Sequence, residues 1–119
     1  MPRVLIVEDD PEMMEWIHDH LIDMERDIEV LIAFTADEGE KQIKENPSVD
    51  LVVLDGCLNG DHPTGVELIP TIREFYPSPK PILAISKSEL LRQFMIEKGC
   101  THECGKNYAP RNILNILGL

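Results

Sequence analysis

The sequence contains no hydrophobic run long enough to cross a membrane, which takes about 20 mainly apolar residues in a helix. Its first apolar run, Val4 to Val7, is short and is followed at once by acidic residues. That arrangement is not typical of a secretory signal peptide. We therefore expect a cytoplasmic protein with no membrane partner.

Cysteine is scarce, with only Cys57, Cys100 and Cys104 in the chain. An odd number at these spacings does not suggest a disulfide framework, and reduced thiols are the simpler interpretation. One alternative stays open, because side chains alternate along an extended strand and would place Cys100, His102 and Cys104 on one side. These residues could bind a soft metal only with a fourth ligand, so two small strand cysteines are the favoured interpretation.

Basic charge is also scarce, but only in the first half of the chain. Residues 1–50 hold fifteen Asp or Glu against four Lys or Arg, whereas residues 51–119 hold seven of each. The whole net charge of −11 therefore lies in the first half. Direct nucleic-acid binding is disfavoured, because phosphate contacts require a basic surface. A cation or a basic partner suits the acidic half better.

The length of 119 residues allows one hydrophobic core and is too short for two domains of ordinary size. No repeat, low-complexity tract or linker divides the chain. We therefore expect one domain over residues 1–119, without a fused DNA-binding module.

Short β-branched runs alternate with amphipathic segments, which is typical of parallel βαβ units. Two runs, Val4 to Val7 and Leu51 to Leu54, are continuously apolar, as central strands covered on both faces should be. The pattern predicts an α/β fold, a three-layer αβα sandwich with five parallel strands and five helices. Pro70 conflicts with its predicted helix, since an interior proline removes a hydrogen bond. The expected strands are 3–8, 28–34, 50–55, 81–86 and 100–106, and the expected helices are 11–24, 37–45, 65–75, 89–98 and 110–117.

Polar residues stand where the predicted strands end. Open parallel sheets bind ligands beyond the carboxyl ends of their strands. Glu8, Asp9 and Asp55 would meet there, and a hard divalent cation such as Mg²⁺ would relieve their mutual repulsion. Ser86 and Lys106 supply a hydroxyl and an ammonium group suited to phosphate oxygens. Together they indicate a phosphoryl-transfer site, whereas Asp10 is interpreted as the N-cap of the first helix.

Over nearly its whole length the sequence resembles the receiver domains of bacterial two-component response regulators. The resemblance rests on five motifs in order: Val4-Leu-Ile-Val-Glu-Asp-Asp-Pro, Leu51-Val-Val-Leu-Asp, Gly65-Val-Glu-Leu-Ile, Ile82-Leu-Ala-Ile-Ser, and the stretch 99–106. It implies a flavodoxin-like strand order, 2-1-3-4-5.

The resemblance also implies the roles of the site residues. Asp55 would accept a phosphoryl group from a histidine kinase, a phosphotransfer protein or a small acyl phosphate. Asp9 would be the main Mg²⁺ ligand, with Glu8 as an outer-sphere helper and the backbone carbonyl of Cys57 as a further ligand. Ser86 and Lys106 would contact the phosphoryl group.

The implied function is that of a stand-alone receiver, which catalyses only its own phosphorylation and dephosphorylation and signals to a downstream protein. A receiver-like scaffold that works without phosphate is an alternative. A haloacid-dehalogenase-type phosphatase is another, but it needs an acid where Cys57 stands. A flavodoxin-like cofactor carrier is weaker, because no phosphate-binding glycine loop follows the first strand.

Several positions depart from the family pattern. Asn107 stands where a proline with a cis bond is usual, and a cis bond before a non-proline residue costs roughly 2.5–4 kcal/mol, which predicts a trans bond. Glu103 replaces an aromatic residue that swings inward on activation, and its carboxylate would be costly to bury in that way. Asn59 replaces a common proline, and Lys87 replaces a small residue beside the phosphate. We hypothesise that phosphorylation is retained without the usual serine–aromatic coupling.

Overall fold

A computed structural model of the chain describes residues 1–25, 27–58 and 64–119. Its described strands form a parallel five-stranded sheet in the order β2-β1-β3-β4-β5, which confirms the predicted topology. The strands are β1 (Arg3–Val7), β2 (Glu29–Ala33), β3 (Leu51–Asp55), β4 (Ile82–Ile85) and β5 (His102–Cys104).

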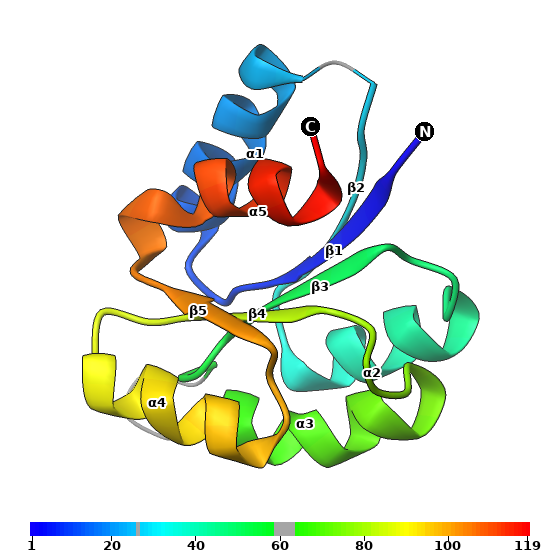
Figure 1. Cartoon of the computed structure of the whole chain (residues 1–119), viewed down its shortest axis with the longest axis vertical. Helices are drawn as coiled ribbons and strands as arrows, with labels where there is room; N and C mark the ends of the chain where they lie inside the picture. The colour runs from blue at the N-terminus through cyan, green and yellow to red at the C-terminus, as the bar shows by residue number, and fades with distance from the viewer. Residues whose placement is uncertain (26, 59–63) are drawn as a thin grey trace.

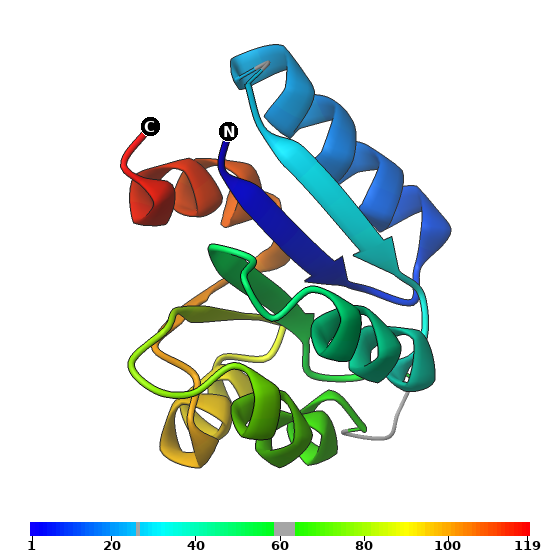
Figure 2. The same ribbon diagram turned by 90° about the vertical axis from the view of Figure 1, so that its right-hand side faces the viewer.

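Helices cover both faces of this sheet. Figure 1 shows α1 and α5 on one side and α2, α3 and α4 on the other, and Figure 2 shows the same three layers from the side. The expected αβα sandwich is thus confirmed. The helices are α1 (Pro11–Met24), α2 (Ala36–Glu45), α3 (Thr64–Phe75), α4 (Glu89–Lys98) and α5 (Ala109–Leu117), with a 3₁₀ turn, η1 (Lys106–Tyr108), before α5.

The central strands β1 and β3 are buried almost completely and divide the core in two. Side chains alternate along each strand, so Leu5 and Val7 pack beneath α2 and α3, while Val4 and Ile6 pack beneath α1 and α5. A strand buried on both faces needs apolar residues at every position, which explains the two uninterrupted apolar runs.

The helix ends follow from local side-chain chemistry. Asp10 Oδ1 accepts a hydrogen bond from the backbone N–H of Glu12 at 3.0 Å, so its predicted role as the cap of α1 is confirmed. Gly99 ends α4 with φ of 129°, a conformation that L side chains rarely adopt. Helix α3 continues through Pro70, which lies on the exposed side of that helix.

The last strand is shorter than expected. Only His102–Cys104 pairs with β4, and Lys106 opens the 3₁₀ turn instead of ending the strand. The prediction of a strand over 100–106 was therefore too long at both ends. Cys100 precedes the strand and packs on the α3 and α4 side, whereas Cys104 packs on the α1 and α5 side.

This placement removes the alternative of a soft-metal site, because His102 is exposed and the two cysteines lie in different halves of the core. Within the described ranges, the only candidate metal cluster is the acidic one at the other strand ends. None of the helices in this part of the chain is long and apolar enough to span a membrane.

Candidate functional site

Three carboxylates meet where β1 and β3 end. Glu8 and Asp9 follow β1, and Asp55 is the last residue of the adjacent β3, whose Leu54 pairs with Val7. One oxygen from each acid lies within 4.8 Å of the others. The sheet itself fixes this convergence, since the backbone N–H of Glu8 still donates to a carbonyl oxygen of β2 at 3.0 Å.

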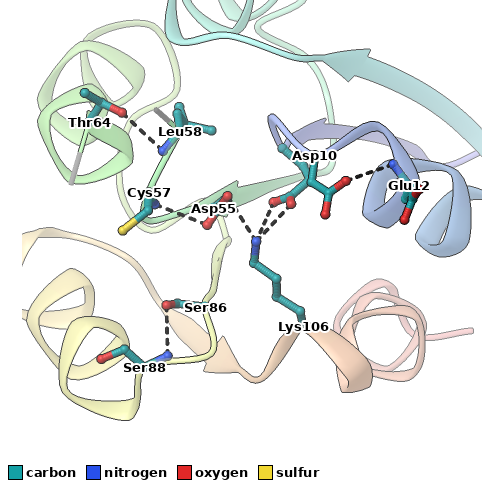
Figure 3. A network of polar contacts seen from close by, with 10 residues as sticks. Asp10, Glu12, Asp55, Cys57, Leu58, Thr64, Ser86, Ser88 and Lys106 are labelled. Atoms are coloured by element: carbon teal, nitrogen blue, oxygen red, sulfur yellow. Dashed lines mark hydrogen bonds and ion pairs between the residues drawn. The ribbon is translucent and has the colours of Figure 1, made fainter. Parts of the chain in front are cut away.

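A single ammonium group is shared between two of these acids. Lys106 Nζ donates to Glu8 Oε1 at 2.9 Å, to Glu8 Oε2 at 3.2 Å and to Asp55 Oδ2 at 3.2 Å. Glu8 is fully buried and Asp55 is 1% exposed. In Figure 3 the Lys106 side chain points toward Asp55 from the far side of the pocket. Two buried carboxylates thus rely on one cation.

The protonation equilibria reflect this shortage of positive charge. Burial raises the pKa of Glu8 to about 8, reinforced by the neighbouring Asp55 and opposed by Lys106. Burial and Asp55 also raise the pKa of Asp9. Burial alone would lower the pKa of Lys106, but its hydrogen bond to Glu8 and the charge of Asp55 raise it. An added cation would therefore be favoured on electrostatic grounds.

The backbone around Asp55 is closely packed. The backbone N–H of Cys57 donates to Asp55 Oδ1 at 3.2 Å. At the start of α3, the N–H of Gly65 donates to the carbonyl of Gly56 at 3.1 Å, and a Cβ atom on residue 65 would overlap the Asp55 carbonyl oxygen. Gly65 thus allows α3 to approach the site. The motif containing Gly65 had been noted in the sequence, but not this role.

A shallow pocket of about 320 Å³ opens above Asp55. Ser86, directly after β4, lines the pocket, and its Oγ accepts a hydrogen bond from the N–H of Ser88 at 3.0 Å, as Figure 3 shows. Of the six predicted site residues, five line the pocket, whereas Glu8 is fully buried and does not. The lining residues are Asp9, Asp55, Cys57, Ser86, Lys87, Ser88, Leu91 and Lys106.

Comparison with known proteins identifies the family. The family model of the response regulator receiver domain matches residues 4–117. The chain belongs to this family. Receiver domains are phosphoacceptor signalling domains of two-component systems and not enzymes in the ordinary sense, which argues against the phosphatase and cofactor-carrier alternatives.

Solved structures of receivers have the same fold. A receiver domain protein of the CheY-like kind from Methanospirillum hungatei is 28% identical, with a TM-score of 0.79 over 99% of this chain and 91% of that one. The chemotaxis protein CheY4 of Vibrio cholerae is 22% identical, with a TM-score of 0.79 over 99% and 97%. NtrX of Brucella abortus is 23% identical, with a TM-score of 0.81, and 26% of its chain is covered. No curated protein sequence matches the chain significantly.

Two of the departures from the receiver pattern are visible in the structure. In the described part of the chain the only cis peptide bond precedes Pro79, so the bond between Lys106 and Asn107 is trans, as predicted. Glu103 faces α4, where its Oε1 accepts a hydrogen bond from Arg92 Nε at 2.7 Å. The sequence did not reveal this partner. The departure at Asn59 lies outside the described residues.

Proposed function

We propose that this receiver acts as one stand-alone domain over residues 1–119 and accepts a phosphoryl group on Asp55. The observation that supports this most directly is the surroundings of that carboxylate. Asp55 lies in an open pocket that Asp9, Ser86 and Lys106 also line, and Lys106 donates a hydrogen bond to its carboxylate. The donor is a histidine kinase, a phosphotransfer protein or a small acyl phosphate.

In the proposed reaction a carboxylate oxygen of Asp55 attacks the phosphorus atom of the donor. The bond from phosphorus to the histidine nitrogen, or to the acyl oxygen, breaks, and the leaving group takes the electron pair. The Lys106 ammonium group moves from its two acids toward the incoming negative charge. The Ser86 hydroxyl donates a hydrogen bond to a phosphoryl oxygen. Positioning and charge neutralisation carry most of the catalysis.

The residues present fit a Mg²⁺ ion. Three carboxylates converge with one ammonium group between them, so the site has excess negative charge and oxygen donors, which Mg²⁺ prefers. Asp9, Asp55 and the backbone carbonyl of Cys57 would hold the ion, and Glu8 would act in its outer sphere. When bound, the ion supplies positive charge to the phosphoryl oxygens. The chain itself provides the nucleophile and the two phosphate-binding groups.

Receiver domains in general exchange signals with histidine kinases and downstream effectors. We place this chain in the cytoplasm and expect it to signal through protein contacts, without binding nucleic acid directly. A phosphate-independent scaffold remains the second candidate, because Glu103 is held by Arg92 and the usual aromatic switch is absent. The two candidates differ in whether a covalent adduct forms.

The decisive experiment is intact-mass spectrometry after incubation with acetyl phosphate and Mg²⁺. We expect a gain of one phosphoryl group that requires Mg²⁺ and is abolished by Asp55→Asn. Asp23→Asn, an exposed acid on α1, is the matched control and should leave the gain unchanged. Absence of any adduct, both with acetyl phosphate and with phosphorylated histidine kinases, would favour the scaffold.

A further inference from the structure

Arg92 makes two short contacts that connect the pocket to β5. This α4 residue donates from Nη1 to the backbone carbonyl of Ser86 at 2.7 Å and from Nε to Glu103 Oε1 at 2.7 Å. The Arg92 side chain is 16% exposed and that of Glu103 is 36% exposed, so the bond to the Ser86 carbonyl is the more shielded of the two. Hydrogen bonds that involve a charged partner are stronger than neutral ones.

Ser86, the residue that carries the hydroxyl of the pocket, is positioned by hydrogen bonds and not by strand pairing. Ser86 follows the end of β4, and β4 pairing stops at Ile85. Beyond that point two hydrogen bonds hold Ser86 itself: Arg92 Nη1 donates to its carbonyl, and the Ser88 N–H donates to its Oγ. One acts on the backbone and the other on the side chain.

Glu103 holds the other end of the guanidinium group. Its register partner on β4 is Ala84, which packs in the core half beneath α3 and α4, so Glu103 projects toward α4. The planar guanidinium can donate in two directions at once with fixed geometry, which a lysine ammonium on a flexible stem does not reproduce. Glu103 therefore fixes Arg92, and Arg92 fixes Ser86.

We infer that Arg92 is a positioning residue that acts through Ser86: anchored on Glu103, it sets the reach of the Ser86 hydroxyl to the phosphoryl group on Asp55. The inference rests on the proposed function. It also gives Glu103 a role. At the position where the family pattern has an aromatic residue, Glu103 connects β5 to the pocket through its ion pair with Arg92.

The test measures the rate at which acetyl phosphate phosphorylates the protein in the presence of Mg²⁺. Intact-mass spectrometry gives the phosphorylated fraction at each time. Arg92→Ala and Ser86→Ala should each slow the reaction by about three- to tenfold, the effect of losing one ordinary hydrogen bond in the transition state. The double variant should be no slower than Ser86→Ala alone, because Arg92 acts through that hydroxyl. Arg92→Lys should not restore the rate.

Matched controls separate positioning from general structural support. Lys98→Ala removes a positive charge from the other end of α4 and should leave the rate unchanged. Glu103→Ala, which releases the anchor, should slow the reaction as Arg92→Ala does, again only when Ser86 is present. Urea unfolding of each variant checks that the fold is intact.

The outcomes are distinguishable. If Arg92→Ala reacts at the wild-type rate, or slows the Ser86→Ala protein further by the same factor, the positioning role is wrong. If Arg92→Lys restores the rate, the charge alone matters and the two-point connection is wrong. A wild-type protein that accepts no phosphoryl group overturns the proposed function itself, and the inference with it.

Discussion

Gly65 lies directly against the backbone of Asp55, with no room for a side chain between them. A Cβ atom on residue 65 would overlap the Asp55 carbonyl oxygen and press on the backbone of Gly56. Because backbone atoms cannot turn aside as a flexible side chain can, any substitution there must displace the start of α3 or the end of β3. A displacement of the start of α3 should therefore also move the proposed acceptor Asp55.

Gly65→Ala should therefore lower stability and disturb the pocket together. We expect a loss of about 1–3 kcal/mol in the free energy of unfolding, the usual cost of forcing extra atoms into a packed site. Urea denaturation measures it. Gly105→Ala is the matched control, since a Cβ atom there would make only ordinary contacts with Tyr108. Equal stability of the two variants would contradict the close packing.

Protons and a divalent cation should compete at the acidic cluster. In the metal-free protein the folded-state pKa of Glu8 is about 8, above its unfolded value, and that of Asp9 is also raised. The folded state therefore binds more protons than the unfolded state, and the stability contributed by Glu8 is lost as pH rises toward 8. We expect Mg²⁺ to raise the melting temperature more at pH 8 than at pH 6.

Thermal unfolding with EDTA or Mg²⁺ across this range provides the measurement. Glu8→Gln should make the melting temperature of the metal-free protein depend less on pH between 5 and 8, because the residue that titrates there is removed. A metal-free stability that stays flat over the same interval in the wild type would show that Glu8 is already ionised at pH 5.

Arg73 of α3 stabilises the layer of α2, α3 and α4 by donating hydrogen bonds to backbone carbonyl groups. Its guanidinium group donates to the carbonyl of Gly99 through Nε and Nη2, and to those of Tyr76 and Lys80 through Nη1, at 2.7–3.2 Å. Arg73→Ala should cost about 2–3 kcal/mol of unfolding free energy, because hydrogen bonds from a charged donor are lost at once. Arg111→Ala, an exposed residue of α5, should change it little.

Thiol reactivity should distinguish the three cysteines. Burial raises the pKa of Cys100 to about 12 and that of Cys104 to about 11, so neither forms much thiolate near pH 8. Cys57 is only half-buried and lines the pocket. A disulfide reagent such as DTNB should modify one thiol in the native protein, and Cys57→Ala should abolish that reaction. Fast modification of two or three thiols would show that the core opens readily.

The sequence was most informative where one local rule decides the structure. The capping of α1 by Asp10, the stop of α4 at Gly99 and the doubly buried strands β1 and β3 all follow from short patterns. The approximate bounds predicted for α1 and α4 coincide with those of the structure. The meeting of Glu8, Asp9 and Asp55 at one edge followed from parallel topology alone.

Contacts between elements that are distant in sequence could not be predicted from such short patterns. The short extent of β5 is a matter of its pairing with β4, which covers only His102–Cys104 and which no pattern within 100–106 indicates. Glu103 was recognised as unusual, but its bond to Arg92 depends on how α4 lies across β5. The clearance at Gly65 likewise exists only once α3 meets β3. The sequence pattern thus predicts the helices and strands, whereas these contacts depend on how the helices and strands pack together.

The bond between Lys106 and Glu8 joins residues 98 positions apart in sequence. During synthesis Glu8 and Asp55, the two acids that bond to Lys106, leave the ribosome before this ammonium partner exists, because chains emerge from the amino terminus. Until Lys106 has emerged, only solvent ions can balance the charge of these two carboxylates. A chain that ends before residue 106 should therefore lack the one ammonium group that neutralises these acids, and burying them in a folded core should be costly.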